Sequence, residues 1–326
     1  MKSIMACAVA ALLAATGVAE AKELRSSGAP PAGTPWGKVT DAFAAKVAEL
    51  SGGTLTINHF LANQLGDEQT TIRQVARGRL DMGIYSNTAA SLLVPEFGLL
   101  ASPFAFDDVV QADCVADDHL LATFGDAFDK SGVVPIGWLE VGNQIIFGKD
   151  PITSPADLAG VKIRTAPTKT DTLFMEAAGG SAVPLGTTDA MPALKTGNVS
   201  AATWPAVYGI AVGYHKVAPH VTPTNHVHQI GAIVVSKKVW DGLSAEEQGW
   251  MREAAEMFKG LRKGVRGAEQ ALLKKAASEG ATIHASDDAA WRAVAPGVQP
   301  QIVSELGGSA EATWAAISAA KAACGG

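Results

Sequence analysis

Several residue types that build catalytic and nucleic-acid-binding surfaces are scarce in this sequence. Charged residues make up 18% of the 326 positions, aromatic residues make up 6%, and there are three cysteines. Acidic residues outnumber basic ones, and the net charge is −6 at pH 7. Without a basic patch, the chain lacks the electrostatic footprint of a nucleic-acid-binding protein. We therefore expect no nucleic-acid partner.

The sequence motifs of common enzymes are missing as well. The chain has no GxSxG turn, no phosphate-binding loop and no GxGxxG after a strand. The glycine pairs Gly52-Gly53 and Gly179-Gly180 lack the Lys and the Ser or Thr that a phosphate-binding loop requires. His215, His220 and His228 show no HExxH or comparable spacing, which argues against zinc. These absences argue against an enzyme of the common classes. A secreted α/β enzyme acting on a small carboxylate is kept as an alternative function.

Long hydrophobic runs are also absent, since none reaches the roughly 18 apolar residues of a transmembrane helix. Residues 1–21 instead have the pattern of a secretory signal peptide. Lys2 supplies a positive start, residues 4–15 form a short apolar core, and Ala19-Glu20-Ala21 matches an A-x-A cleavage site. We predict cleavage after Ala21 and export to the periplasm. A membrane-anchored sensor domain would need an attached segment that the sequence does not show.

Two cysteines follow the predicted cleavage site, Cys114 and Cys324, whereas Cys7 lies inside the signal peptide. An even number of cysteines in an oxidising compartment is compatible with a disulfide. The two residues lie in distant parts of the sequence, so the sequence leaves their pairing open.

Strand and helix patterns alternate from the start of the mature chain. Residues 23–28 and 54–60 have strand patterns, and residues 36–50 form an amphipathic helix between them. A helix over residues 109–128 then leads to a strand over residues 133–139. This order predicts an α/β fold that begins with a parallel β-α-β unit.

A second strand–helix series begins at residues 161–164, where apolar and basic residues alternate and Arg164 closes the strand. It continues with helices over residues 168–178 and 187–194 and with strands at residues 182–185 and within 199–208. The carboxyl ends of strands in α/β sheets are where ligands bind. Arg164 is therefore predicted to face a ligand, with a surface ion pair as the alternative.

A long helix is predicted over residues 244–279, because a capping box at Ser244 opens a sustained apolar periodicity. At ~1.5 Å per residue it would measure about 54 Å. We expect it to bend near Gly260, Gly264 or Gly267. A last strand at residues 280–284 and helices over residues 291–323 complete the chain.

Several short sequence segments, taken together in their order, resemble those of the solute-binding proteins of TRAP transporters (the DctP-like family). They are residues 63–68, 78–83, 95–106 and 160–164, Val183-Pro184, residues 194–197 and Trp204-Pro205. The resemblance implies a two-lobed α/β fold of the periplasmic-binding-protein type, with a long helix spanning both lobes. It places lobe I at residues 22–143 and 229–265, and lobe II at residues 144–228 and 266–326. It also implies a binding subunit, not an enzyme, that delivers a small organic acid to the membrane permease subunits.

The resemblance assigns roles to three residues of the second series. Arg164 would clasp the carboxylate of the ligand, while Gln144 stands where many family members have a second arginine. Gln144 together with Trp204 resembles the branch that binds small 2-oxo and 2-hydroxy acids, in which the Gln helps to hold a metal ion. In that branch a Glu precedes the Trp, but here Thr203 does. We therefore expect no metal, and Gln144 and Trp204 would be its ligands if one were present.

The remaining candidate contacts are Tyr85, Ser86, Asn87, Tyr208 and His226. Ser86 and Asn87 end a strand, where they can contact a ligand or merely cap the next helix. His226 matches a histidine of the family near the hinge, and a structural role is the alternative. With one cation and a large indole in the cleft, we expect a monocarboxylate; core packing by Trp204 is the alternative.

Overall fold

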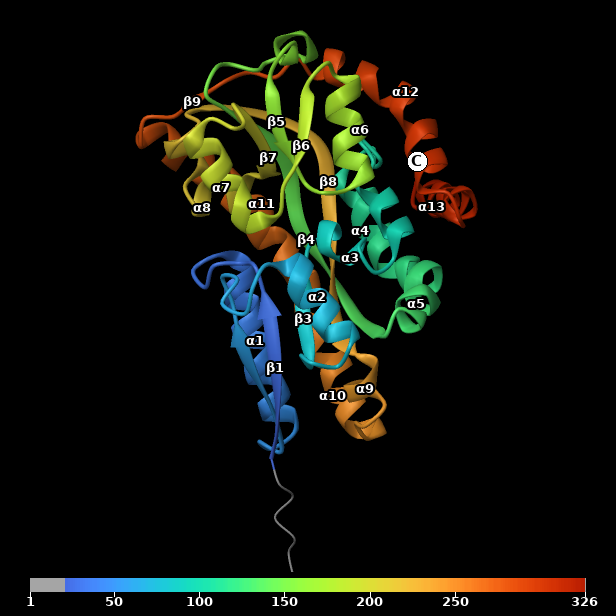
Figure 1. The fold of residues 1–326 in the computed structure, drawn as a ribbon. Coiled ribbons are helices and arrows are strands. Elements are labelled where there is room, and N and C mark those ends of the chain that lie inside the picture. Colours follow the sequence, from blue (N-terminus) through green and yellow to red (C-terminus); the bar gives the residue numbers. More distant parts are fainter. Residues whose placement is uncertain (1–20, 326) are drawn as a thin grey trace, which may run out of the picture.

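The computed structural model describes residues 21–325, so the predicted signal peptide lies outside the described residues except for Ala21. Within these residues the chain forms a single mixed sheet of nine strands with helices packed around it (Figure 1). The strands are β1 (Lys22–Gly28), β2 (Leu55–Phe60), β3 (Met82–Tyr85), β4 (Val133–Gly148), β5 (Lys162–Thr165), β6 (Ser181–Pro184), β7 (Ala201–Pro205), β8 (His220–Ser236) and β9 (Thr282–Ile283). Their order is β2-β1-β3-β8-β4-β7-β5-β6, and β9 pairs with β8.

The N-terminal half has the predicted parallel β-α-β start. Strands β2 and β3 both pair in parallel with β1. Helix α1 (Pro35–Leu50) connects β1 to β2 and buries Phe43 and Val47 completely. Burying each such side chain stabilises the fold by about 1.5–3 kcal/mol. Helices α2 (Glu68–Ala76) and α3 (Asn87–Ala90) and the 3₁₀ helix η1 (Pro95–Ala101) complete this half.

Two long antiparallel strands connect the two lobes. Strand β4 has 16 residues and β8 has 17, and they pair from Val133–Ser236 at one end to Gly148–His220 at the other. Their register shifts between Glu140 and Gly142 and again between Gln144 and Ile146. A further shift lies between Pro135 and Gly137, so the pairing of these strands is irregular at three places.

The second half repeats the strand–helix alternation around β5, which pairs in parallel with β6 and β7. Its helices are the 3₁₀ helix η2 (Pro155–Leu158), α6 (Lys169–Ala177), α7 (Thr187–Thr196), α8 (Ala206–Ala211) and the 3₁₀ helix η3 (Tyr214–Lys216). Gly197 ends α7 with a left-handed conformation, φ 80°. Gly186 is the N-cap of α7, so the helix begins at Thr187, where the sequence predicted its start.

The long C-terminal helix is divided. After the short helix α9 (Lys237–Trp240), α10 (Ala245–Ala255) and α11 (Met257–Ser278) are separated at Glu256. The backbone tightens there, since the amides of Glu256 and Lys259 donate to carbonyls three residues earlier. The predicted bend at a glycine is therefore wrong, and α11 alone measures about 33 Å at ~1.5 Å per residue. It still packs on α1 in one lobe and on α8 in the other.

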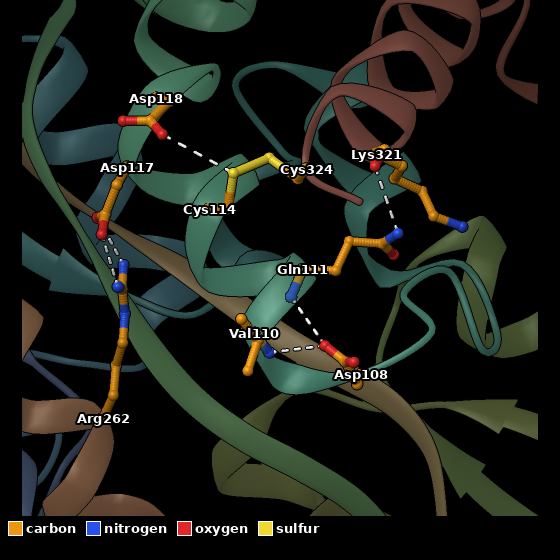
Figure 2. Close-up of a disulfide and its surroundings, with 9 residues drawn as sticks. All are labelled: Asp108, Val110, Gln111, Cys114, Asp117, Asp118, Arg262, Lys321 and Cys324. Carbon is orange, nitrogen blue, oxygen red and sulfur yellow. Dashed lines mark hydrogen bonds and ion pairs between the residues drawn. A yellow bond between two sulfur atoms is a disulfide. The ribbon is translucent and has the colours of Figure 1, made fainter. Parts of the chain in front are cut away.

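The predicted helix over residues 109–128 is also divided, into α4 (Val109–Asp118) and α5 (Leu120–Lys130). His119 separates them because its φ of −124° lies outside the helical range. After α12 (Asp288–Leu306), the last helix α13 (Ala310–Ala323) packs against α4 and α5. Cys114 of α4 and Cys324, which follows α13, form a disulfide (Figure 2). The pairing that the sequence left open is thus settled.

Helix α4 also holds α11 through ion pairs. Arg262 donates two hydrogen bonds to Asp117, at 2.8 and 2.7 Å (Figure 2). Arg266 donates two to Asp113 at 3.0 and 2.6 Å, and it lies 2.6 Å from the carboxylate of Glu140 on β4. These contacts link α4, α11 and the irregular part of β4.

The overall architecture agrees with the predicted two-lobed α/β fold (Figure 1). The lower part of the view holds β1, β2 and β3, the upper part holds β5, β6 and β7, and β4 and β8 run through both. Nothing in the structure tests the lobe boundaries at residues 143 and 228 or at residue 265, so they stay predictions. In the described part of the chain, no helix is long and apolar enough to cross a membrane.

Candidate ligand-binding site

A cavity of about 60 Å³ lies between the two halves of the sheet. A single buried water needs roughly 10–15 Å³, so this cavity has room for a small ligand. Segments from both halves contribute to its lining. The lining residues are Ala29, Pro30, Trp36, Glu68, Ile84, Tyr85, Ser86, Thr88, Leu139, Val141, Gln144, Arg164, Ala166, Thr187, Thr203, Trp204, Pro205, Tyr208 and Gln229.

Arg164 is the basic side chain of this lining, and its backbone position is set by β5 between β6 and β7. The guanidinium donates to the carbonyl of Leu185 from Nε at 3.1 Å and from Nη2 at 2.9 Å, and to the carbonyl of Thr203 from Nη1 at 2.9 Å. A guanidinium has five N–H donors. Two of them, one on each terminal nitrogen, therefore have no partner within residues 21–325. The carbonyls fix the group while leaving a two-pronged donor available.

The indole of Trp204 packs against this guanidinium, with Cζ of Arg164 3.6 Å from the ring centroid. Tyr208 and Tyr214 lie on the same indole, with centroids 5.2 and 5.1 Å away. A cation over an indole face is attracted by the ring and loses freedom of movement. Trp204 thus holds Arg164 in place, and the same indole could also cover the apolar face of a ligand. That covering role stays a prediction.

Gln144 reaches the cavity from β4 and is tied to a second buried acid. Its Nε2 donates to Asp171 Oδ2 at 3.3 Å, and the backbone amide of Ala166 donates to the same oxygen at 3.3 Å. Gln144 Oε1 is buried without a hydrogen-bond partner in the described residues, and so is Thr187 Oγ1. Buried polar atoms are nearly always paired in folded proteins. Both atoms therefore remain available to a bound molecule.

A carboxyl group lies on the other side of the lining. Glu68, at the start of α2, accepts a hydrogen bond from the hydroxyl of Ser86 at 2.6 Å and another from its backbone amide at 3.1 Å. Ser86 also caps α3 by accepting from the amide of Ala89 at 3.4 Å. Ser86 therefore serves as the predicted helix cap and lines the cavity as well.

Burial shifts the titration of all three charged groups in and behind this cavity. It lowers the pKa of Arg164 to about 10, although nearby anionic groups oppose that change. It raises the pKa of Glu68 and of Asp171, and in both cases the positive charge of Arg164 opposes the change. Arg164 is still protonated at neutral pH, so the cavity presents a desolvated cation.

The structure places seven of the nine predicted site residues in this lining: Tyr85, Ser86, Gln144, Arg164, Thr203, Trp204 and Tyr208. Their roles in binding are not tested by this placement. The hydroxyl of Tyr85 shares a 2.7 Å hydrogen bond with Ser27, and the hydroxyl of Thr203 donates to the Arg164 carbonyl at 3.4 Å. Both side chains therefore already have protein partners.

Asn87 and His226 lie outside the lining, and their predicted role as ligand contacts stays a prediction. The Asn87 amide donates to the carbonyl of Phe97 at 2.9 Å. His226 shares a 2.7 Å hydrogen bond with Thr224 and stacks on Phe174 at 5.5 Å. Burial lowers the pKa of His226 to about 3, so its ring is neutral. Both residues pack the core around the cavity.

The sequence interpretation missed four residues that shape the site: Trp36, Glu68, Asp171 and Thr187. Glu68 ends the family segment at residues 63–68, so a signal for it was present. Asp171 lies inside a helix pattern, and nothing in that pattern distinguishes it from a solvated residue. Only the packing of α6 against β5 and β6 places its carboxyl beside Gln144.

The residues present fit a metal ion poorly. Gln144 Oε1 is an available oxygen, but the hydroxyl of Thr203 is engaged where the metal-binding branch has a carboxylate. A cation beside Trp204 would also lie next to the Arg164 guanidinium, which would repel it.

Comparisons with known proteins agree with this architecture. Residues 26–305 match the family described as bacterial extracellular solute-binding protein, family 7 (DctP). The C4-dicarboxylate-binding periplasmic protein DctP of Rhodobacter capsulatus is 24% identical over 323 residues, which cover 97% of this chain and 96% of that protein.

Solved structures show the same fold. A TRAP periplasmic solute-binding protein from Bradyrhizobium sp., in complex with D-galacturonate, is 27% identical with a TM-score of 0.85, covering 92% of this chain and 100% of that one. Another from Chromohalobacter salexigens, with bound D-glucuronate, is 26% identical with a TM-score of 0.82, covering 91% and 99%.

Proposed function

This chain belongs to family 7 of the bacterial extracellular solute-binding proteins, and we propose that it captures a small monocarboxylate in the cavity around Arg164. The proteins of this family are periplasmic binding proteins for transport. We propose that this chain is likewise exported, binds its ligand without turnover and delivers it to the membrane subunits of a TRAP transporter.

One observation carries the proposed ligand class. Arg164 is 2% exposed, its position is fixed by three hydrogen bonds, and one N–H donor on each terminal nitrogen has no partner in the described residues. A carboxylate accepts two parallel N–H bonds from a guanidinium, and such charge-assisted pairs are among the strongest hydrogen bonds in proteins. An anionic planar group is therefore the natural partner.

The charge of the lining supports one carboxylate in preference to two. Arg164 is the one basic side chain among the lining residues, and Gln144 is neutral. A second carboxylate would be desolvated without a cation, which costs several kcal/mol. A C4-dicarboxylate therefore fits less well than a monocarboxylate.

Unpaired acceptors support a hydroxylated acid. Gln144 Oε1, Thr187 Oγ1 and the carboxylate of Glu68 can each accept a hydrogen bond from a ligand hydroxyl. The sugar acids bound by the relatives from Bradyrhizobium sp. and Chromohalobacter salexigens have one carboxylate and several hydroxyls. We propose a hydroxylated monocarboxylate of this kind, or a smaller 2-hydroxy or 2-oxo acid.

The proposed mechanism is closure of the lobes around the acid. Closure removes water from the cavity, which strengthens the pair between the ligand carboxylate and Arg164. The aromatic rings of Trp36, Tyr208 and Trp204 would exclude solvent from the ligand. We propose that the membrane permease recognises this closed shape.

A matched ligand panel tests the proposal. Thermal shift and calorimetry would compare D-glucuronate, D-galacturonate, lactate and pyruvate with succinate and malate, while product analysis would follow any turnover. We expect binding of at least one monocarboxylate and no chemical change. Succinate or malate binding about tenfold more tightly than every monocarboxylate would refute the ligand class, and turnover would support the enzyme alternative.

A further inference from the structure

Buried carboxyl groups in and directly behind the cavity outnumber its single basic group. Glu68 and Arg164 are the charged residues of its lining, and they are 7% and 2% exposed. Asp171, which is 4% exposed, lies directly behind Gln144 at hydrogen-bond distance. One guanidinium therefore faces two carboxyl groups before any ligand enters.

A bound acid adds a third carboxyl group to this set. If all three were ionised, a single cation would face three anions in a space that excludes water. Uncompensated buried charge costs several kcal/mol, and proteins usually relieve it by holding a proton. Closely interacting acids share such a proton, and the entry of a further anion strengthens the effect.

We propose that capture of a monocarboxylate at Arg164 is coupled to the uptake of one proton, and that Glu68 is the group that carries it. This coupling rests on the proposed function of the cavity. Glu68 is the assigned carrier because it lines the cavity, whereas Asp171 lies behind Gln144. The incoming carboxylate therefore faces Glu68 across the same space.

The hydrogen bonds of Glu68 suit both of its protonation states. The Ser86 hydroxyl lies 2.6 Å from Oε1 and can donate to the carboxylate or accept from the protonated acid, because a hydroxyl does either. The Ser86 amide at 3.1 Å holds Oε2 in both states. The carboxyl group can therefore gain a proton without losing its position.

Asp171 is the other buried carboxyl group of this set whose pKa burial raises, and the phenols near Glu68 offer no carrier near neutral pH. Arg164 and Asp67 act on the charge of Glu68, the first favouring and the second opposing its ionised form. Burial raises the pKa of Tyr85 and Tyr208, and the charge of Glu68 raises it further, so both phenols stay neutral. Burial already raises the pKa of Glu68 itself, which prepares it to accept a proton when a second anion arrives.

A ligand with a cationic group would need no proton, because its cation could pair with Glu68. Proton uptake therefore distinguishes a simple acid from a zwitterion in this cavity. It also predicts the direction of the pH dependence, since uptake on binding makes the affinity fall as the pH rises.

Calorimetry of the full chain in two buffers tests the coupling. Each acid of the panel (D-glucuronate, D-galacturonate, lactate and pyruvate) would be titrated at pH 7 in phosphate and in Tris, whose ionisation enthalpies differ widely. The difference in apparent enthalpy gives the number of protons taken up. The carboxyl groups of these acids titrate well below neutral pH and stay ionised at pH 7, so the protein must supply the binding site for the proton.

We expect uptake approaching one proton and an affinity that falls up to about tenfold per pH unit between pH 6 and pH 8. Glu68→Gln resembles the protonated acid, and it should abolish the uptake and bind at pH 8 at least as tightly as the wild type. Asp171→Asn is the matched control and should retain the uptake. Thermal unfolding would confirm that both variants are folded, and the wild-type comparison between buffers stands without them.

Zero uptake by the wild type, with an acid bound, would overturn the coupling but leave the proposed function intact. Uptake that persists in Glu68→Gln would overturn the assignment to Glu68. Failure of every acid to bind would refute the proposed function, and the coupling with it.

Discussion

Replacement of Arg164 should affect ligand binding far more than folding. In Arg164→Ala, the carbonyls of Leu185 and Thr203 lose their charged donors. At about 1.5–3 kcal/mol for each acceptor, the loss amounts to about 3–6 kcal/mol. The folded protein regains part of it, because burial lowers the pKa of Arg164 from 12.5 to about 10. That change corresponds to about 3 kcal/mol for holding the charge, so we expect a net destabilisation of about 0–3 kcal/mol.

The loss of affinity has no such compensation. Removing one partner of a buried charged pair costs about 2–5 kcal/mol, or roughly 30-fold to several thousandfold in affinity. Arg164→Lys keeps the charge but loses the two-pronged geometry, so its loss should be smaller than that of Arg164→Ala. Lys162→Ala is the matched control, because Lys162 lies exposed on the same strand.

Two measurements separate the effects. Urea unfolding of the ligand-free proteins gives the change in stability, and calorimetry with the tightest-binding monocarboxylate gives the change in affinity. Binding by Arg164→Ala within about threefold of the wild type would show that the carboxylate is held elsewhere. A similar loss of affinity in Lys162→Ala would show that the effect is not specific to the guanidinium.

Three further predictions concern metal, pH and redox state. Ligand affinity measured by calorimetry should survive exhaustive chelation, and a loss that calcium restores would contradict this. Burial raises the pKa of Glu140 from 4.5 to about 7, so the folded protein holds a proton that the unfolded chain has released. The free energy of unfolding should therefore fall by about 1.4 kcal/mol for each unit that the pH rises between the two pKa values. Glu140→Gln should flatten the dependence of urea unfolding on pH between pH 5 and pH 8. An unchanged profile would show that another group titrates. Replacing Cys114 and Cys324 with Ser should lower the stability by about 2–5 kcal/mol, and a urea midpoint insensitive to reductant in the wild type would argue against the bond.

The order of strands and helices followed from the sequence because apolar periodicity reports directly on buried faces. The breaks at His119 and Glu256 did not, since the periodicity continues across both. At Glu256 the change is a local shift in backbone hydrogen bonding, which leaves the apolar stripe in place. The glycines of α11 were a poor guide because a helix packed along its length tolerates them.

Strand ends were good predictors of the site, and side-chain partnerships were not. Two of the residues that line the cavity lie one position before the end of their strands: Arg164 in β5 and Trp204 in β7. Gln144 also lines it, from within β4. The pairing of Gln144 with Asp171 and the stacking of Arg164 on Trp204 depend on how the elements pack in space. Asn87 follows the same strand-end rule but turns its amide to the backbone of η1, so the rule alone does not identify a contact.

The bond between Cys114 and Cys324 changes what a break in the backbone would do. The residues between them, including β4, β8 and α11, form one covalent ring. A protease cut within this ring would leave a connected molecule, which would separate into two fragments on a gel only after reduction. A mechanical pull on residues 22 and 325 would likewise be carried by the sulfur bridge. At ~3.3–3.6 Å per residue, the 210 positions that separate the two cysteines correspond to roughly 700 Å of extended chain. The pull could extend this part of the chain only after the bridge is reduced.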